Sequence, residues 1–169
     1  PAAYDSLDFE FLMNQTGYTH LDYDNTGSFK DYFQEISYNQ FLPFSKVTNW
    51  IMAPEQHSHY SYSNPDGWSH VRQLVRHTVD ELENQGFDWS KFDNDGDGYV
   101  DALNIIHQGA GAEQGDHSNI WSHKSSLGEL SVLYDGVIIN SYTMNPEIQS
   151  GNIAAIGVLS HEFGHALGL

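Results

Sequence analysis

Two segments place apolar side chains three and four residues apart, which is the spacing of one face of an α-helix. The first predicts an amphipathic helix that follows Ser28 as its N-cap and ends near Asn39. The second predicts a long helix whose apolar positions extend from Trp68 to Leu82 and which stops at Gly86. The apolar face of the first helix consists of Phe29, Tyr32, Phe33 and Ile36.

Other segments carry the pattern of β-strands. Residues 41–52 predict a strand with Pro43 near its start, and the apolar run of residues 100–107 is typical of a buried strand. Two further apolar runs, residues 131–134 and 137–139, flank the pair Asp135 and Gly136. An Asp-Gly pair between such runs predicts a β-hairpin.

The remaining segments complete the fold class. Residues 1–27 hold no valine or isoleucine and predict mostly irregular structure, and residues 54–67 and 108–129 predict polar loops. The apolar run of residues 153–159 predicts a buried helix with Asn152 as its N-cap. Alternation of helices and strands along one unbroken domain predicts an α/β fold, a mixed sheet backed by helices. In the first segment we expect four side chains to pack on the core: Phe9, Phe11, Leu12 and Met13.

The charge of the chain is strongly acidic. Its 169 residues carry 6 Lys and Arg against 23 Asp and Glu, a net charge of −17. This balance disfavours nucleic acid and anionic membrane surfaces as partners. No apolar run approaches the roughly 20 residues of a transmembrane helix. The chain also lacks cysteine, so it has neither disulfides nor a thiolate metal site, and any zinc must be held by His and carboxylate side chains.

The last ten residues contain the pattern H-E-x-x-H, at His161, Glu162 and His165. Residues four apart share one face of a helix, so the two imidazoles can bind one metal ion. Glu162 is one position further round, where it can take a proton from a water molecule at the metal. The alternative is a buried helix with two hydrogen-bonded histidines, but such polar groups form a poor core without a metal.

A second metal signal lies at residues 93–101. Asp93, Asp95, Asp97 and Asp101 occupy positions 1, 3, 5 and 9 of a D-x-D-x-D-G loop, and Tyr99 offers its carbonyl at position 7. Position 12 is Asn104 instead of the bidentate Glu, and a strand is predicted to follow in place of a helix. We therefore expect a structural calcium ion that is not part of an EF-hand pair. The alternative is an ordinary acidic turn.

Several other titratable residues have no assigned role at this stage. The simplest interpretation of His117 and His123 is a solvated or hydrogen-bonded histidine, although either can line a cleft or bind a further metal. His107 ends the predicted strand of residues 100–107 and is expected to neighbour the H-E-x-x-H helix. Glu113 and Glu147 can orient a ligand or add to a calcium site, and no pattern selects between these roles.

Five segments stand out together: residues 27–38, residues 50–54, the acidic loop that runs into residues 104–109, residues 120–123 and residues 157–169. They resemble the immune inhibitor A family of secreted bacterial metallopeptidases. The terminal segment is the most specific of them. The resemblance implies a zincin-like fold, a mixed twisted sheet with a backing helix and the active-site helix at the C-terminus. It also implies a secreted zinc endopeptidase with structural calcium that acts on protein or peptide substrates, and we expect a monomer.

The resemblance implies roles for individual residues. His161 and His165 would be zinc ligands, Glu162 the general base, and the carboxylates of the acidic loop calcium ligands. Two departures from the family pattern stand out. No Val/Ile-rich strand precedes Ser28, and the acidic residue expected after the terminal glycine would lie two positions beyond Leu169. We therefore expect residues 1–169 to be the upper half of a catalytic domain, without the third zinc ligand, and to have little or no activity alone.

In an intact enzyme we expect an extended peptide to pair with an edge strand beside the cleft, and residues 137–143 are the candidate. Two other functions stay open from the sequence. One is a zinc hydrolase with a non-protein substrate, such as a deformylase or an amidase. The other is a calcium-stabilised binding module without enzymatic activity. Replacement of Glu162 separates them, because only a hydrolase needs its carboxylate.

Overall fold

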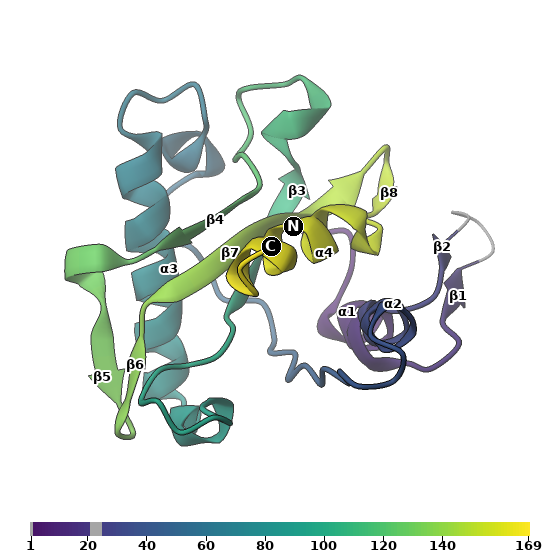
Figure 1. Cartoon of the computed structure of the whole chain (residues 1–169). Coiled ribbons are helices and arrows are strands. Elements are labelled where there is room, and N and C mark those ends of the chain that lie inside the picture. Colours follow the sequence, from purple (N-terminus) through teal and green to yellow (C-terminus); the bar gives the residue numbers. More distant parts are fainter. Residues whose placement is uncertain (1, 21–24) are drawn as a thin grey trace.

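A mixed sheet lies at the centre of the computed structural model, which describes residues 2–20 and 25–169. Its strand order is β3–β7–β4, and β8 pairs with the end of β7. β3 (Asn104–Ala110) runs parallel to β7 (Ser141–Gln149), whereas β4 (His123–Ser126) and β8 (Asn152–Ile153) run antiparallel to it. β7 crosses the middle of the molecule (Figure 1). The α/β class and the mixed sheet predicted from the sequence are confirmed.

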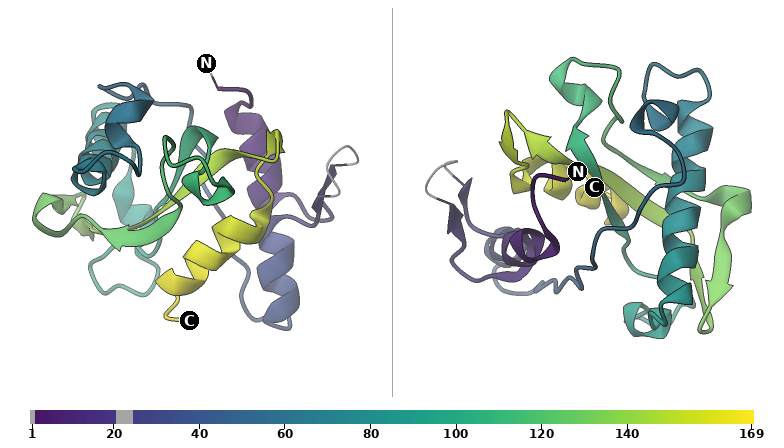
Figure 2. Two further views of the ribbon diagram at one scale, coloured as in Figure 1. Left: turned by 90° about the horizontal axis from the view of Figure 1, so that it is seen from above. Right: turned by 180° about the vertical axis from the view of Figure 1, so that it is seen from behind.

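Helices cover both faces of this sheet (Figures 1 and 2). On one face, α3 (Gly67–Asn84) packs Val71, Val75 and Val79 into the main core, which includes Ile105 of β3. The neighbouring side chain, Ile106, points to the opposite face because side chains alternate along a strand. There it meets the clusters formed by α1 (Ser6–Asn14), α2 (Phe29–Ile36) and α4 (Ile156–Ala166).

The first 27 residues differ from their prediction. Instead of irregular structure they form α1 and a two-stranded ribbon of β1 (Thr19–His20) and β2 (Asn25–Thr26). Residues 1 and 21–24 lie outside the described part of the chain. A capping box accounts for α1, because Asp5 accepts from the Asp8 amide while the Asp8 carboxylate accepts from Asp5 N at 2.8 Å. Three of the four predicted core side chains are buried, Phe9, Leu12 and Met13, but Phe11 is 44% exposed.

The helix predicted after Ser28 is confirmed as α2, with Ser28 as its N-cap. It ends at Ile36, earlier than predicted, because Tyr38 and Asn39 adopt left-handed backbone angles (φ 53° and 63°). The strand predicted at residues 41–52 is wrong. This segment has no regular secondary structure, and no backbone–backbone hydrogen bond joins it to the sheet in the described part of the chain.

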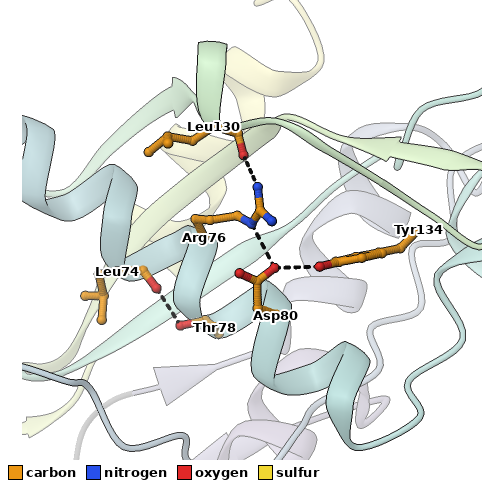
Figure 3. A network of polar contacts seen from close by, with 6 residues as sticks. All are labelled: Leu74, Arg76, Thr78, Asp80, Leu130 and Tyr134. Atoms are coloured by element: carbon orange, nitrogen blue, oxygen red, sulfur yellow. Dashed lines mark hydrogen bonds and ion pairs between the residues drawn. The ribbon is translucent and has the colours of Figure 1, made fainter.

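The second predicted helix and the predicted hairpin are both confirmed. The hairpin consists of β5 (Val132–Tyr134) and β6 (Val137–Ile139), and its turn residues Asp135 and Gly136 have positive φ angles of 50° and 86°. These angles suit the tight turn that an Asp-Gly pair favours. A polar network joins the hairpin region to α3 (Figure 3). Its central contacts are Arg76 to Asp80 at 2.8 Å, Tyr134 to Asp80 at 2.8 Å and Arg76 to the carbonyl of Leu130 at 3.1 Å.

The predicted strand at residues 100–107 starts later, at Asn104. Val100 donates its amide to the carbonyl of Ile138 at 3.0 Å and so pairs with the hairpin instead of the sheet. The predicted loop of residues 54–67 contains a 3₁₀ turn, His57–Tyr60, and that of residues 108–129 contains all of β4. None of the described helices is long and apolar enough to span a bilayer.

Candidate metal centre

The H-E-x-x-H motif lies on α4, as the sequence predicts. The helix starts at Ile156, however, and its N-cap is Ala155, which has no side-chain cap. The proposed cap, Asn152, belongs to β8, since residues 152–153 pair with β7. The predicted helix start at residue 153 is therefore wrong by three residues. At the other end Gly168 has a φ of 85°, the left-handed conformation that commonly follows a helix.

The residues of the motif differ in their exposure, because one face of α4 packs on the core and the other is open to solvent. Leu159 and Phe163 pack into the core between α2 and α4, and Phe163 makes edge-on contacts with Phe29 and Phe33 at ring-centroid distances of 5.1 and 5.2 Å. His161 and His165 are exposed, with ring centroids 4.7 Å apart. The aromatic packing thus fixes the helix with both imidazoles on its open face.

The two imidazoles fit a zinc ion. His165 Nδ1 lies 3.1 Å from the carbonyl oxygen of Leu169. A hydrogen bond from Nδ1 to a carbonyl leaves Nε2 with its lone pair available for a metal, which is the usual arrangement of ligating histidines. Among the described residues, no third His, Asp or Glu lies within ligand distance of this pair. The one group of three such residues that could share a metal ion lies in the acidic loop. Two imidazoles that could share one metal ion thus lie side by side on α4.

Glu162 is buried beneath the imidazoles, with 8% of its surface exposed. Burial raises the pKa of its carboxyl, and the nearby Glu113 carboxylate adds to that rise. His161, His165 and the backbone N–H of Lys124 oppose the change and lower the pKa. A carboxylate with a raised pKa is a better proton acceptor, as a general base requires.

The backbone of β4 reaches this site. β4 pairs only with β7 among the described strands, so its other edge is open. Thr143 donates its amide to the carbonyl of Leu103, just before β3. Its backbone groups thus point away from β4, so Lys124, opposite Thr143, must direct its own backbone groups to the open edge. The predicted edge strand, residues 137–143, is wrong. Residues 137–139 pair with β5 and residues 141–143 lie inside the sheet, which leaves β4 as the edge beside Glu162.

Glu113, which no sequence pattern assigned, lies near enough to this site for its charge to add to the raised pKa of Glu162. It lies in the short 3₁₀ turn Ala112–Gln114, and its Oε2 accepts from the Ser122 amide at 3.2 Å. Its Oε1 is shielded from solvent and has no hydrogen-bond partner in the described part of the chain. The carboxylate lies where a Cβ on Gly111 would be, so the glycine makes room for it. Because Glu113 and Glu162 are 49 positions apart, no local spacing could have revealed this.

The acidic loop lies at a different place, before β3. Oxygen atoms of Asp93, Asp95 and Asp101 lie within 4.8 Å of one another, which brings together three of the predicted calcium ligands. Asp97 is not in that group, and its Oδ1 accepts instead from the Tyr99 amide at 2.8 Å. Tyr99 itself forms an isolated bridge with Ile138, so its backbone is held beside β6. Calcium at this loop stays a prediction.

Three of the remaining titratable residues are buried. Burial lowers the pKa of His107 to about 4 and also lowers the pKa of His123, whose ring contacts the carbonyl of Trp121 at 2.7 Å and the hydroxyl of Tyr142 at 3.3 Å. Glu147 is fully buried and accepts from the amides of Tyr4 and Gly109 at 2.8 and 2.9 Å. It therefore joins the N-terminal segment to the end of β3. His117 is exposed on its loop.

Comparison with known proteins gives consistent matches. A sequence model described as the immune inhibitor A peptidase M6 catalytic domain matches residues 2–169. Immune inhibitor A of Bacillus thuringiensis subsp. alesti is 29% identical over an alignment of 175 positions, gaps included, that covers 84% of the chain and 25% of that relative. The pre-pro-metalloprotease PrtV of Vibrio cholerae serotype O1 is 29% identical over an alignment of 192 positions that covers 95% of the chain and 20% of PrtV. The chain therefore spans a quarter or less of these relatives.

Proposed function

The chain belongs to the immune inhibitor A family of M6 peptidases, and from this premise we propose that it contributes the general base and two zinc ligands of a secreted endopeptidase. The observation that carries the proposal is the division of α4 into two exposed imidazoles and one buried carboxylate. That arrangement fits hydrolysis of a peptide bond by water. The family membership also argues against a deformylase, an amidase or a non-enzymatic binding module.

The proposed mechanism assigns one task to each group. His161 and His165 would hold zinc, and the metal would supply a Lewis acid to polarise the scissile carbonyl and acidify water. Glu162 accepts a proton from the attacking water at its carboxylate and passes it to the leaving amine. Glu113 supports this step, because its charge raises the pKa of Glu162 and so strengthens the base.

We propose that the substrate is a protein or peptide in extended conformation that lies along the open edge of β4. The backbone of Lys124 faces that edge and also contacts Glu162, so a strand bound there is directed toward the base. Main-chain hydrogen bonds to a sheet edge hold a peptide without regard to most of its side chains. Extended binding of this kind therefore suits an endopeptidase.

Residues 1–169 by themselves are proposed to bind zinc weakly and to turn over little substrate. Only two protein ligands for zinc come together in the described part of the chain, whereas catalytic zinc sites usually hold three. A monomeric state and a structural calcium ion at Asp93, Asp95 and Asp101 complete the proposal. The calcium assignment is supported by the convergence of these three carboxylates.

Glu162→Gln tests the proposal in the protein as its host produces it. The substitution keeps the size of the side chain but removes its proton-accepting carboxylate, so cleavage of a labelled casein should fall by roughly a hundredfold or more. Zinc content, measured by inductively coupled plasma mass spectrometry, should stay unchanged because both imidazoles remain.

The matched control is Glu35→Gln, which makes the same chemical change at an exposed position of α2. It should leave both cleavage and zinc content as they are. Full casein cleavage by the Glu162 variant would remove Glu162 from the mechanism. Loss of zinc together with cleavage would instead indicate that Glu162 maintains the metal site.

A further inference from the structure

His57 and His107 form a second pair of neighbouring imidazoles, apart from the pair on α4. Their ring centroids are 5.7 Å apart, and the ring planes are inclined by 49°. The imidazoles of His161 and His165 have a similar spacing, with centroids 4.7 Å apart. Because a bond from a metal to a ring nitrogen is about 2 Å long, one ion fits between two imidazoles at this separation.

Two distant segments bring this pair together. His107 lies on β3 two positions after Ile105, so it shares the face of the sheet that packs on α3. His57 begins the 3₁₀ turn His57–Tyr60, whose last residue is buried in the same core. The His70 ring of α3 contacts the carbonyl of His59 at 2.9 Å, which fixes the turn on α3. The pair is therefore part of the folded core and not of a loose loop.

The Nε2 atoms of both rings are shielded from solvent and have no hydrogen-bond partner among the described residues. Burial lowers the pKa of both imidazoles, that of His107 to about 4, so both are neutral at pH 7. His107 Nδ1 lies 3.1 Å from the carbonyl of Gln108. Since a carbonyl only accepts, Nδ1 carries the proton and Nε2 of His107 presents a lone pair. A buried lone pair without a partner is unfavourable, which favours an electron-pair acceptor at this place.

We propose that His57 and His107 bind one copper(I) ion through their Nε2 atoms. The ion gives each shielded nitrogen the partner that no described residue supplies. Neutral imidazole is the form of histidine that ligates metals, and it suits copper. The site lies on the face of the sheet opposite α4, so it is separate from the proposed peptidase site.

The charge of the site and the number of its ligands select the metal. Among the described residues, no Asp, Glu or third His lies within ligand distance of both rings. Two neutral ligands do not offset the charge of a buried ion, and the cost of burial rises with that charge, which favours a singly charged ion. Copper(I) is also stable with only two ligands, whereas Ca²⁺ and Mg²⁺ need several oxygen ligands.

Copper(I) itself is the probe, delivered to the full chain from its coloured bicinchoninate complex with ascorbate present. His165→Gln is introduced first, because the imidazole pair of α4 would otherwise compete for the ion. This protein should withdraw about one copper(I) ion per chain, measured as loss of colour. A further His57→Gln or His107→Gln should weaken the uptake at least tenfold. No uptake, or full uptake by both of these variants, would overturn the proposal.

His59→Gln is the matched control, because it makes the same change in the same 3₁₀ turn and should leave the uptake unchanged. Equal loss in this control would contradict a role of His57 as a ligand. Near-UV circular dichroism shows whether the variants fold, and His57→Gln, at a partly exposed position, carries the test if His107→Gln does not.

Nitrogen-15 NMR of the imidazoles gives an independent readout. One equivalent of copper(I) should shift the Nε2 resonances of both His57 and His107, and it should leave that of the exposed His117 in place. A shift of only one of the two resonances would exclude a shared ion. Because neither measurement involves peptide cleavage, failure of this proposal is distinguishable from failure of the proposed function.

Discussion

Burial decides what individual side chains of this domain can do. Glu162 and His161 are neighbours on α4, yet the carboxylate is 8% exposed and the imidazole lies open to solvent. Burial makes the carboxylate more basic, and exposure leaves the imidazole accessible to a metal. His107, which is 5% exposed, shifts in the opposite direction, because burial disfavours the charged form and the charged form of a histidine is the protonated one.

The pKa of His107 gives a testable pH dependence of stability. Burial lowers it to about 4, with the charges of His57 and His123 in the same direction and the Gln108 carbonyl opposed. Below its ordinary value of 6.5 the unfolded chain therefore binds the proton that the folded chain refuses. The contribution of His107 to the free energy of unfolding is fully present above pH 6.5. It is smaller by about 2 kcal/mol at pH 5, and it is lost as the pH passes 4.

Urea unfolding at pH 7 and pH 5 measures this contribution. Between pH 7 and pH 5, the free energy of unfolding of His107→Gln should fall by about 2 kcal/mol less than that of the parent chain, whatever the stability of the variant at pH 7. His117→Gln, at an exposed loop position, should lose as much as the parent. Parallel losses for all three proteins would show that His107 does not cause the acid sensitivity.

Elements of this fold depend on partners as well as on their own pattern. Residues 41–52 carry a strand-like pattern, but a strand exists only where a ladder forms, and no described ladder reaches them. Residues 152–153 show the reverse case, a strand where the sequence pattern favours a helix. Their apolar neighbours suit a helix, but pairing with β7 makes them a strand and delays α4 to Ile156.

Two glycine substitutions should change stability in opposite directions. Gly157 lies inside α4 with no heavy atom within 4 Å of an added Cβ, so Gly157→Ala should stabilise by about 0.5–1 kcal/mol. Gly111→Ala would place its Cβ on the Glu113 carboxylate and break the contact to Ser122, which should cost about 1 kcal/mol. Urea unfolding of both variants is the measurement, and equal shifts would contradict the close approach at Gly111.

Charge acts on the molecule as a whole. The chain carries −17, and part of that charge is concentrated where Asp93, Asp95 and Asp101 meet ahead of β3. A cation there would relieve their repulsion and hold the segment between the turn Trp89–Phe92 and the sheet. Calcium would therefore stabilise the entire domain.

Metal analysis and calorimetry test this for the chain purified without chelator. We expect about one calcium ion per chain and less than one zinc ion, because three carboxylates meet at the loop but only two imidazoles meet on α4. EGTA should lower the melting temperature by several degrees, and Asp95→Asn should remove most of that response. Asp116→Asn, on an exposed loop, is the control. A melting temperature that ignores EGTA would exclude a stabilising calcium.

Local spacing alone determined much of the site. The positions of His161 and His165 follow from four-residue spacing on a helix, and α2, α3 and the turn at Asp135 follow from patterns within a few residues. The H-E-x-x-H motif and the acidic loop can likewise be read from local sequence, because all residues of each lie within a dozen positions. Such features need no distant partner.

Only the tertiary structure decided the contacts between distant segments. It placed β7 inside the sheet and β4 at the edge, since strand order depends on pairings that no single segment encodes. It also brought Glu113 to Glu162 and enclosed Glu147 among amides of Tyr4 and Gly109. The physical reason is that a ladder or a buried charge is stabilised by groups tens of residues away, which become neighbours only when the core forms.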